Sequence, residues 1–174
     1  YRVSCPRIVL QRITGVDSKV RIIATLIDKY VYCANSTNYI SLDDTINIKY
    51  LLGLLNSTLV NFFIKQTSTN TNITAKVLNS IPIIVSSSEE QILISNLVEY
   101  ISILKKNKQL TAIVSNETIA SFFDKILDGC VYELYFEEHM KKQEINIIDS
   151  ALKLIKPITH LSSNNEKADV IINV

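Results

Sequence analysis

The chain has 174 residues, of which 47% are hydrophobic and 20% charged, and its formal net charge is +1. This composition excludes a disordered polymer, and the length suits one sizeable domain or two small lobes that share a core. No apolar stretch approaches the roughly 20 residues that a membrane-spanning helix needs, and no signal-peptide pattern is present, so the sequence predicts a cytoplasmic protein without a membrane partner. Because the chain begins with Tyr1 rather than Met, we expect it to be part of a longer protein.

The first quarter of the chain favours β-strands. Two β-branched runs, RIVLQRIT (7–14) and KVRIIATLI (19–27), flank a segment of turn-forming residues and predict a β-hairpin. Two shorter strands are expected in KYVYCAN (29–35) and NYISL (38–42). Polar residues occupy alternating positions of both parities in 7–14, so one face of that strand is predicted to lie outside the core.

An amphipathic helix is predicted next, over residues 48–66. Its apolar positions recur every three or four residues, at Ile48, Leu51, Leu52, Leu55, Leu59, Phe62 and Phe63. A second stripe recurs every four residues and consists of small or polar side chains that allow another backbone or a ligand to approach closely: Gly53, Ser57, Asn61 and Lys65. Asn56 and Ser57 are poor helix formers at the centre of this helix. Two interpretations stay open, a hydrogen bond to the backbone of a packed strand and a direct contact with a ligand.

The rest of the chain is predicted to be mainly helical after one polar loop. The loop, QTSTNTNITAK (66–76), leads into VLNSIPIIV (77–85), where Pro82 predicts an extended segment that returns to the fold. Apolar periodicity then predicts helices over 89–106, 117–136 and 143–155, followed by a tail with a terminal strand. The sequence thus predicts an α+β fold: a small twisted, mainly antiparallel sheet with a packed helix, followed by a helical C-terminal lobe. The expected parts are a strand-rich region (1–86), a helical lobe (87–160) and a tail (161–174).

Catalytic and metal-binding patterns are absent from the sequence. There is no glycine-rich phosphate loop or nucleophile elbow, and His139 and His160 are isolated from other candidate ligands. Cys5, Cys33 and Cys130 are far apart and odd in number, so they predict structural thiols rather than disulfides or zinc ligands. No catalytic residue, metal or cofactor is expected in this fragment.

Charge is distributed unevenly along the chain. Residues 1–82 carry nine Lys or Arg against four Asp, a net charge of +5, and the remainder carries a net charge of −4. A basic half beside an acidic half is typical of a surface that binds a polyanion, with two ordinary mixed surfaces as the alternative. Basic, amide and hydroxyl side chains contact phosphates and read base edges in DNA complexes. The candidate DNA contacts of this kind are Arg7, Gln11, Arg12, Lys19, Arg21, Lys65, Thr69, Asn70, Asn72 and Lys76.

Four stretches of the chain, in this order and spacing, carry a resemblance to a known family: RIVLQRITG, VRIIATLID, KYLLGLLNSTLVNFFIKQ and LNSIPI. They resemble the TaqI-like C-terminal specificity domain of bacterial restriction-modification enzymes and N6-adenine DNA methyltransferases. ILDGCVYELYFEEH (126–139) is similar to the helix that often closes this domain, so that the resemblance covers about residues 5–140. It places Asn56 and Ser57 in the recurring "NS" of the helix, with Pro82 in the return segment and Arg12 as the basic residue after the first strand.

The resemblance implies a target recognition domain that reads double-stranded DNA. In such enzymes a separate N-terminal methyltransferase domain of the same chain binds S-adenosylmethionine and flips out an adenine. The resemblance further implies that Asn56, Ser57 and Pro82 are structural, because their motif recurs irrespective of the sequence that is read. The alternative is a helical protein-interaction module that docks a partner subunit without touching DNA.

Overall fold

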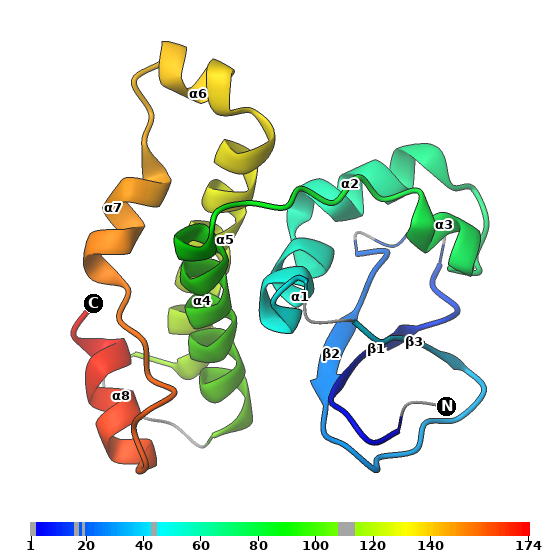
Figure 1. Ribbon diagram of the computed structural model, residues 1–174, viewed down its shortest axis with the longest axis horizontal. Helices are drawn as coiled ribbons and strands as arrows, with labels where there is room; N and C mark the ends of the chain where they lie inside the picture. The colour runs from blue at the N-terminus through cyan, green and yellow to red at the C-terminus, as the bar shows by residue number, and fades with distance from the viewer. Residues whose placement is uncertain (1–2, 16–17, 19, 43–44, 108–113) are drawn as a thin grey trace. The chain divides into compact units, whose positions relative to one another are not determined.

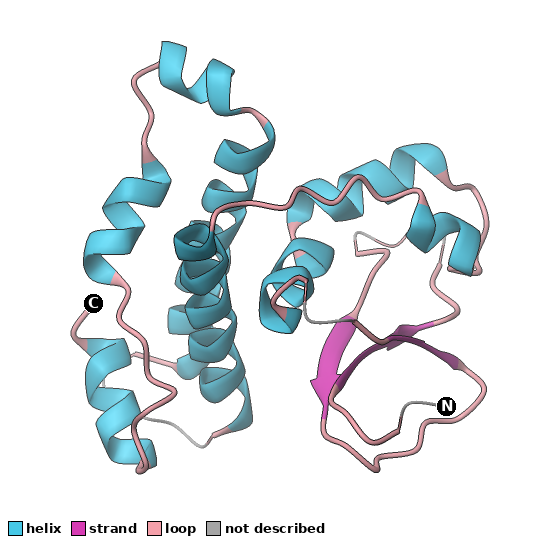
Figure 2. Cartoon of the chain, in the orientation of Figure 1, coloured by secondary structure: helices cyan, strands magenta, loops and turns pink. Residues whose placement is uncertain are grey.

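The computed structural model describes residues 3–15, 18, 20–42, 45–107 and 114–174, which form three strands and eight helices (Figure 1). The chain divides into two compact units, Tyr1–Val85 and Ser86–Val174. All strands of the described part belong to the first unit, whereas the second unit is helical (Figure 2). The predicted α+β class is confirmed.

The sheet of the first unit has three antiparallel strands, β1 (Arg7–Gln11), β2 (Ala24–Ile27) and β3 (Thr37–Ile40). β1 lies between the other two, with Val9 opposite Thr25 of β2 and Tyr39 of β3. The predicted pairing of the first two runs is therefore present, although both strands are shorter than expected. Segment 29–35 is not a strand as predicted, because Tyr30 adopts a positive φ of 65° that turns the chain out of an extended path.

Both faces of β1 are covered. The side chains of Arg7, Ile8, Val9 and Leu10 are all buried, so the prediction that one face of this strand lies outside the core is wrong. The reason is tertiary: the backbone N–H of Tyr30 donates to the carbonyl of Val3 at 2.7 Å, which ties the 29–35 segment to the N-terminal segment that precedes β1. The helix Ile48–Asn56 (α1) packs on β1 and β2. The burial of β1 thus depends on segments outside the strand, which strand alternation does not indicate.

The predicted helix over 48–66 is two helices, α1 (Ile48–Asn56) and α2 (Thr58–Thr67). Ser57 separates them with an extended conformation, φ −63° and ψ 152°. Its hydroxyl donates to the carbonyl of Leu54 at 2.7 Å and accepts from the N–H of Val60 at 3.3 Å. The expectation of one continuous helix is wrong, because a serine whose hydroxyl satisfies both helix ends can end one helix and begin the next.

The return segment is only partly extended. Residues Ala75–Asn79 form a short helix, α3, where the end of the polar loop and the start of an extended segment were predicted. Thr74 caps this helix by accepting from the N–H of Val77 at 3.3 Å. The chain after Pro82 is irregular, and the hydroxyl of Tyr50 in α1 donates to the carbonyl of Ile84 at 2.8 Å. The extended segment predicted over 77–85 is therefore present only after α3, where it returns to α1.

The helices of the second unit are α4 (Ser88–Lys106), α5 (Asn116–Tyr135), α6 (Glu137–Lys142), α7 (Ile147–Leu154) and α8 (Asn164–Ile172). α4 and α5 pack together, and α7 packs against both. The terminal strand expected in the tail is wrong, because Ser163 begins a capping box with Glu166 that starts a helix instead.

Two polar side chains tie the second unit together. Tyr100 packs edge-to-face on Phe123, and its hydroxyl donates to the carbonyl of Lys156 at 2.7 Å. Burial raises the pKa of Tyr100, which favours the protonated donor. Glu133, the acidic residue of the VYELY stretch, accepts at Oε2 from the N–H groups of Ile147 (2.6 Å) and Ile148 (2.9 Å). This carboxylate therefore caps the first turn of α7, a role that supports packing rather than chemistry.

Candidate nucleic-acid interface

The end of strand β1 is where the chain gathers its exposed polar side chains. Beyond Gln11 the backbone continues beside the 71–73 segment: the N–H of Thr14 donates to the carbonyl of Thr71 at 2.9 Å, and the N–H of Ile73 donates to the carbonyl of Arg12 at 2.8 Å. An isolated bridge between Ile13 and Asn72 completes this pairing. Residues 12–14 and 71–73, which are distant in the sequence, are thereby held side by side. We call this paired region, at the end of β1, the junction.

The buried side chain of Arg21 binds the backbone of the polar loop. Arg21 is 0% exposed, and its guanidinium donates to the hydroxyl of Thr14 at 3.3 Å and to the carbonyl of Ser68 at 3.0 Å. A third bond goes to the carbonyl of Asn70. Since all three acceptors are neutral oxygens, Arg21 acts as a fork that orders the loop backbone.

Six of the predicted DNA contacts lie at or beside this junction and are exposed: Gln11, Arg12, Thr69, Asn70, Asn72 and Lys76. Their proximity could not be read from the sequence, because it depends on the pairing of the 71–73 segment with the end of β1. Lys65 is also exposed, in the last turn of α2. Lys19 lies outside the residues that the structure describes.

Two predicted DNA contacts are buried, and their assignment as surface contacts is wrong. Arg21 is held as described above, and Arg7 is only 5% exposed. The guanidinium of Arg7 donates to the carbonyl of Val31 and, at 3.5 Å, to that of Cys5. Strand alternation does not distinguish an exposed arginine from a buried one whose N–H groups donate to distant carbonyls. The prediction from sequence was therefore wrong for both side chains.

The amides of α1 and α2 bind backbone rather than solvent. Asn56 accepts at Oδ1 from the N–H of Ala24 and donates from Nδ2 to the carbonyl of the same residue, both at 3.0 Å. Asn61 accepts from the N–H groups of Arg21 and Ile22, each at 2.7 Å, and donates to the carbonyl of Ser57 at 3.0 Å. The segment that leads into β2 is therefore the backbone that approaches the small, polar stripe of this helix pair.

A second exposed feature shares Arg12 with this junction: a hollow of about 390 Å³ opens beside β3. Its lining includes Arg7, Arg12 and Asn35, together with Tyr32 and Tyr39. Tyr32 and Tyr39 were placed by sequence in two predicted strands, 29–35 and 38–42, and neither side chain was assigned a role in binding. The available signal was the clustering of Tyr30, Tyr32 and Tyr39 within ten residues of an otherwise polar stretch.

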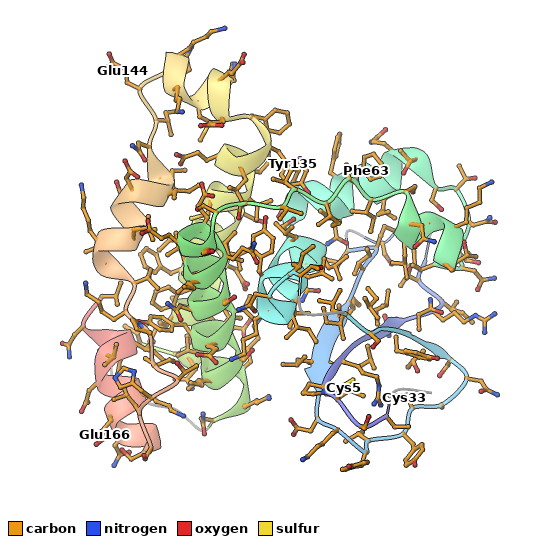
Figure 3. All side chains as sticks on the ribbon, viewed as in Figure 1. Cys5, Cys33, Phe63, Tyr135, Glu144 and Glu166 are labelled. Atoms are coloured by element: carbon orange, nitrogen blue, oxygen red, sulfur yellow. The ribbon has the colours of Figure 1, made fainter. Side chains whose placement is uncertain are left out.

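Thiols and metal ligands add no reactive centre to the described part of the chain. Burial, and then the nearby carboxylate of Glu133, raises the pKa of Cys130 to about 12. Cys33 is exposed in the loop before β3, where Figure 3 labels it.

Within residues 3–15, 18, 20–42, 45–107 and 114–174, no three potential metal ligands come together. No helix of these residues is long and apolar enough to cross a bilayer.

Comparison with known proteins finds a family match in the first unit. Residues 1–83 match the TaqI-like C-terminal specificity domain. This part, slightly less than half of the chain, is similar to that family. The match ends within the return segment, so it contains β1 to β3, α1 to α3 and the polar loop between α2 and α3.

A curated relative extends the similarity beyond the specificity domain. It is a protein of Methanocaldococcus jannaschii, provisionally named as a type II restriction enzyme and methyltransferase, and it is 29% identical over 114 residues. The alignment covers 61% of this chain but only 9% of the relative. The chain thus corresponds to a small part of that much longer protein. No solved structure matches the chain.

Proposed function

We propose that the chain is the DNA-reading part of a larger restriction-modification or adenine-N6 DNA methyltransferase enzyme, and that it recognises a specific sequence in duplex DNA. The observation that carries this proposal is the junction at the end of β1. There the polar loop pairs with the residues that follow the strand, and amide, hydroxyl and basic side chains of the two segments are exposed. The family of residues 1–83 and the name of the curated relative support the same function.

Each exposed side chain of this junction has a chemical role that suits DNA. Arg12 and Lys76 neutralise phosphates or pair with guanine, whereas Gln11, Asn70 and Asn72 offer the paired donor and acceptor that match the major-groove edge of adenine. Arg21 contributes indirectly, because its three hydrogen bonds hold the loop backbone in one conformation. A preordered loop loses less conformational entropy when it binds.

The chemistry of the parent enzyme belongs to other parts of it. A separate N-terminal domain would bind S-adenosylmethionine and flip the target adenine, while the present chain selects the site in cytoplasmic DNA. The relative's name, which includes a methyltransferase, supports this division of labour.

A salt titration tests the proposal on the isolated chain. Binding of a fluorescent random duplex is measured by polarisation at about 50 and about 200 mM salt, where phosphate contacts make affinity fall steeply. At the lower salt we expect a dissociation constant near micromolar, because a single domain contacts only one side of the duplex. At the higher salt we expect a marked decrease in affinity. Absent or salt-independent binding would contradict the proposal and favour a protein-interaction module instead.

A further inference from the structure

Exposed aromatic rings surround the hollow beside β3. Tyr32 is 81% exposed and Tyr39 is 52% exposed, although large aromatic side chains are usually buried or half-buried in folded proteins. Tyr39 projects from the same face of the sheet as Val9, its partner across the strands, and as Arg7. Two flat apolar faces thus remain uncovered next to the basic end of β1.

The loop that carries Tyr32 is held in a strained form. Tyr30 has a φ of 65°, a left-handed conformation that is an outlier for a bulky residue. Two hydrogen bonds retain it: the N–H of Tyr30 to the carbonyl of Val3 at 2.7 Å, and the guanidinium of Arg7 to the carbonyl of Val31. Strain that is supported in this way is characteristic of segments that present a binding surface.

The charge and the volume of the hollow limit the kind of ligand that it can bind. The described residues that line the hollow include two arginines and no carboxylate, so the hollow attracts an anion. Arg12 is exposed there, with one donor on the carbonyl of Asn35 at 3.4 Å. The volume of about 390 Å³ lies in the range of sites for small molecules and is compatible with one nucleotide.

We infer that this hollow holds one unstacked nucleotide of the bound DNA, with its base against Tyr32 or Tyr39 and its phosphate on Arg12. The inference rests on the proposed function and adds a second contact region, formed by the loop between β2 and β3, to the junction at the end of β1. Stacking on an aromatic face is tolerant of sequence, because every base has such a face. The hollow therefore increases the affinity for the DNA strand and does not discriminate between sequences.

The test compares alanine variants on the full 174-residue chain. Binding of a fluorescent oligothymidylate of about 12 nucleotides, and of a fully paired duplex, is measured at about 50 mM salt. Tyr32→Ala and Tyr39→Ala should each weaken binding of the single strand about tenfold. Tyr32→Phe, which keeps the ring, should bind like the wild type. Tyr132→Ala removes an exposed tyrosine from helix α5 and serves as the matched control, with no expected change.

The two readouts separate failure of this inference from failure of the proposed function. Wild-type protein that binds neither DNA would overturn both proposals. Wild-type protein that binds duplex with salt dependence, while both alanine variants bind the single strand as tightly as Tyr132→Ala does, would overturn the inference alone. Melting curves of the variants should superimpose on that of the wild type, since both rings are exposed. Weakened single-strand binding shared by Tyr32→Phe would show that the ring face is not what the DNA contacts, and would also overturn the inference.

Discussion

At the scale of single residues, the first unit depends on polar side chains that satisfy distant backbone groups. Asn61 and Arg21 are both buried, and each makes hydrogen bonds to backbone groups about forty or more positions away. A buried donor or acceptor without a partner costs about 1–3 kcal/mol, which is a large share of a small domain's stability. The same residues that would be judged surface contacts by type therefore act as part of the core.

The two helix asparagines should differ in their contribution to stability. Asn61→Ala should lower the free energy of unfolding by about 3 kcal/mol, because it leaves the N–H groups of Arg21 and Ile22 without their acceptor in a buried position. Asn56→Ala should cost only about 1 kcal/mol, since the Asn56 pair with Ala24 is exposed and water replaces it. Chemical denaturation measures both values, and equal decreases would contradict the burial argument.

Thiol reactivity should distinguish Cys33 from Cys130. At pH 8 the raised pKa of Cys130, about 12, leaves only about one thiolate in ten thousand, and the side chain is also buried. Cys33 is exposed. Brief treatment of the native protein with a maleimide, followed by peptide mass analysis, should label Cys33 and leave Cys130 unmodified. Denatured protein provides the control, in which both cysteines react; labelling of native Cys130 would contradict the assignment.

At the scale of elements, the division of one apolar periodicity into two helices is the main feature. Ser57 ends α1 and begins α2, and its hydroxyl bonds both helices. The break turns the chain so that Asn56 and Asn61 reach the backbone of the same segment, residues 21–24, from consecutive helices. Each side of the break is thus tied to the same stretch of backbone, residues 21–24, at the start of β2.

Removal of the Ser57 hydroxyl should weaken this element measurably. Ser57→Ala should lower the free energy of unfolding by about 1 kcal/mol, because the N–H of Val60 is left without its cap in a buried position. Gln66→Ala, an exposed position later in α2, is the matched control and should change stability by less than about 0.5 kcal/mol. Thermal melting of both variants gives the comparison. An unchanged melting temperature for Ser57→Ala would mean that a continuous helix can form without cost.

At the scale of the whole molecule, the charge asymmetry raises the question of whether DNA is attracted by net charge or by one surface. Residues 1–82 carry a net charge of +5, but the structure buries Arg7 and Arg21 of that segment. Among the described residues, Arg12 and Lys76 are exposed cations at the junction. The helical unit has its own exposed lysines in a setting that is acidic overall.

Two double variants with the same net charge separate these possibilities. Arg12→Ala with Lys76→Ala should weaken duplex binding and flatten its salt dependence, because each phosphate that the protein no longer neutralises reduces the slope of log K against log salt by about 0.9. Lys125→Ala with Lys153→Ala removes two exposed cations from the second unit and should leave binding nearly unchanged. Both variants are titrated with the same duplex at several salt concentrations. Equal weakening by the two double variants would assign binding to overall charge rather than to the junction.

Much of the local structure of this protein was determined by its sequence alone. Apolar periodicity located α4, α5 and α7, and the two β-branched runs predicted the antiparallel pair of β1 and β2. The sequence motifs also identified the family of residues 1–83. These features depend on residues that are close together in the sequence, through helical and strand periodicity. They can therefore be predicted without knowledge of the tertiary structure.

Only the tertiary structure decided which polar side chains are available to a ligand. Arg12 and Arg21 are the same residue type on the same kind of strand-forming sequence, yet one is exposed and the other donates to carbonyls of a loop 47 and 49 positions later. The hollow likewise brings Tyr32, from a loop that contains a positive φ at Tyr30, together with Tyr39 of β3, and no periodicity indicates this. Burial of a polar group is settled by whether distant partners satisfy it, and that is a property of the folded chain rather than of its local pattern.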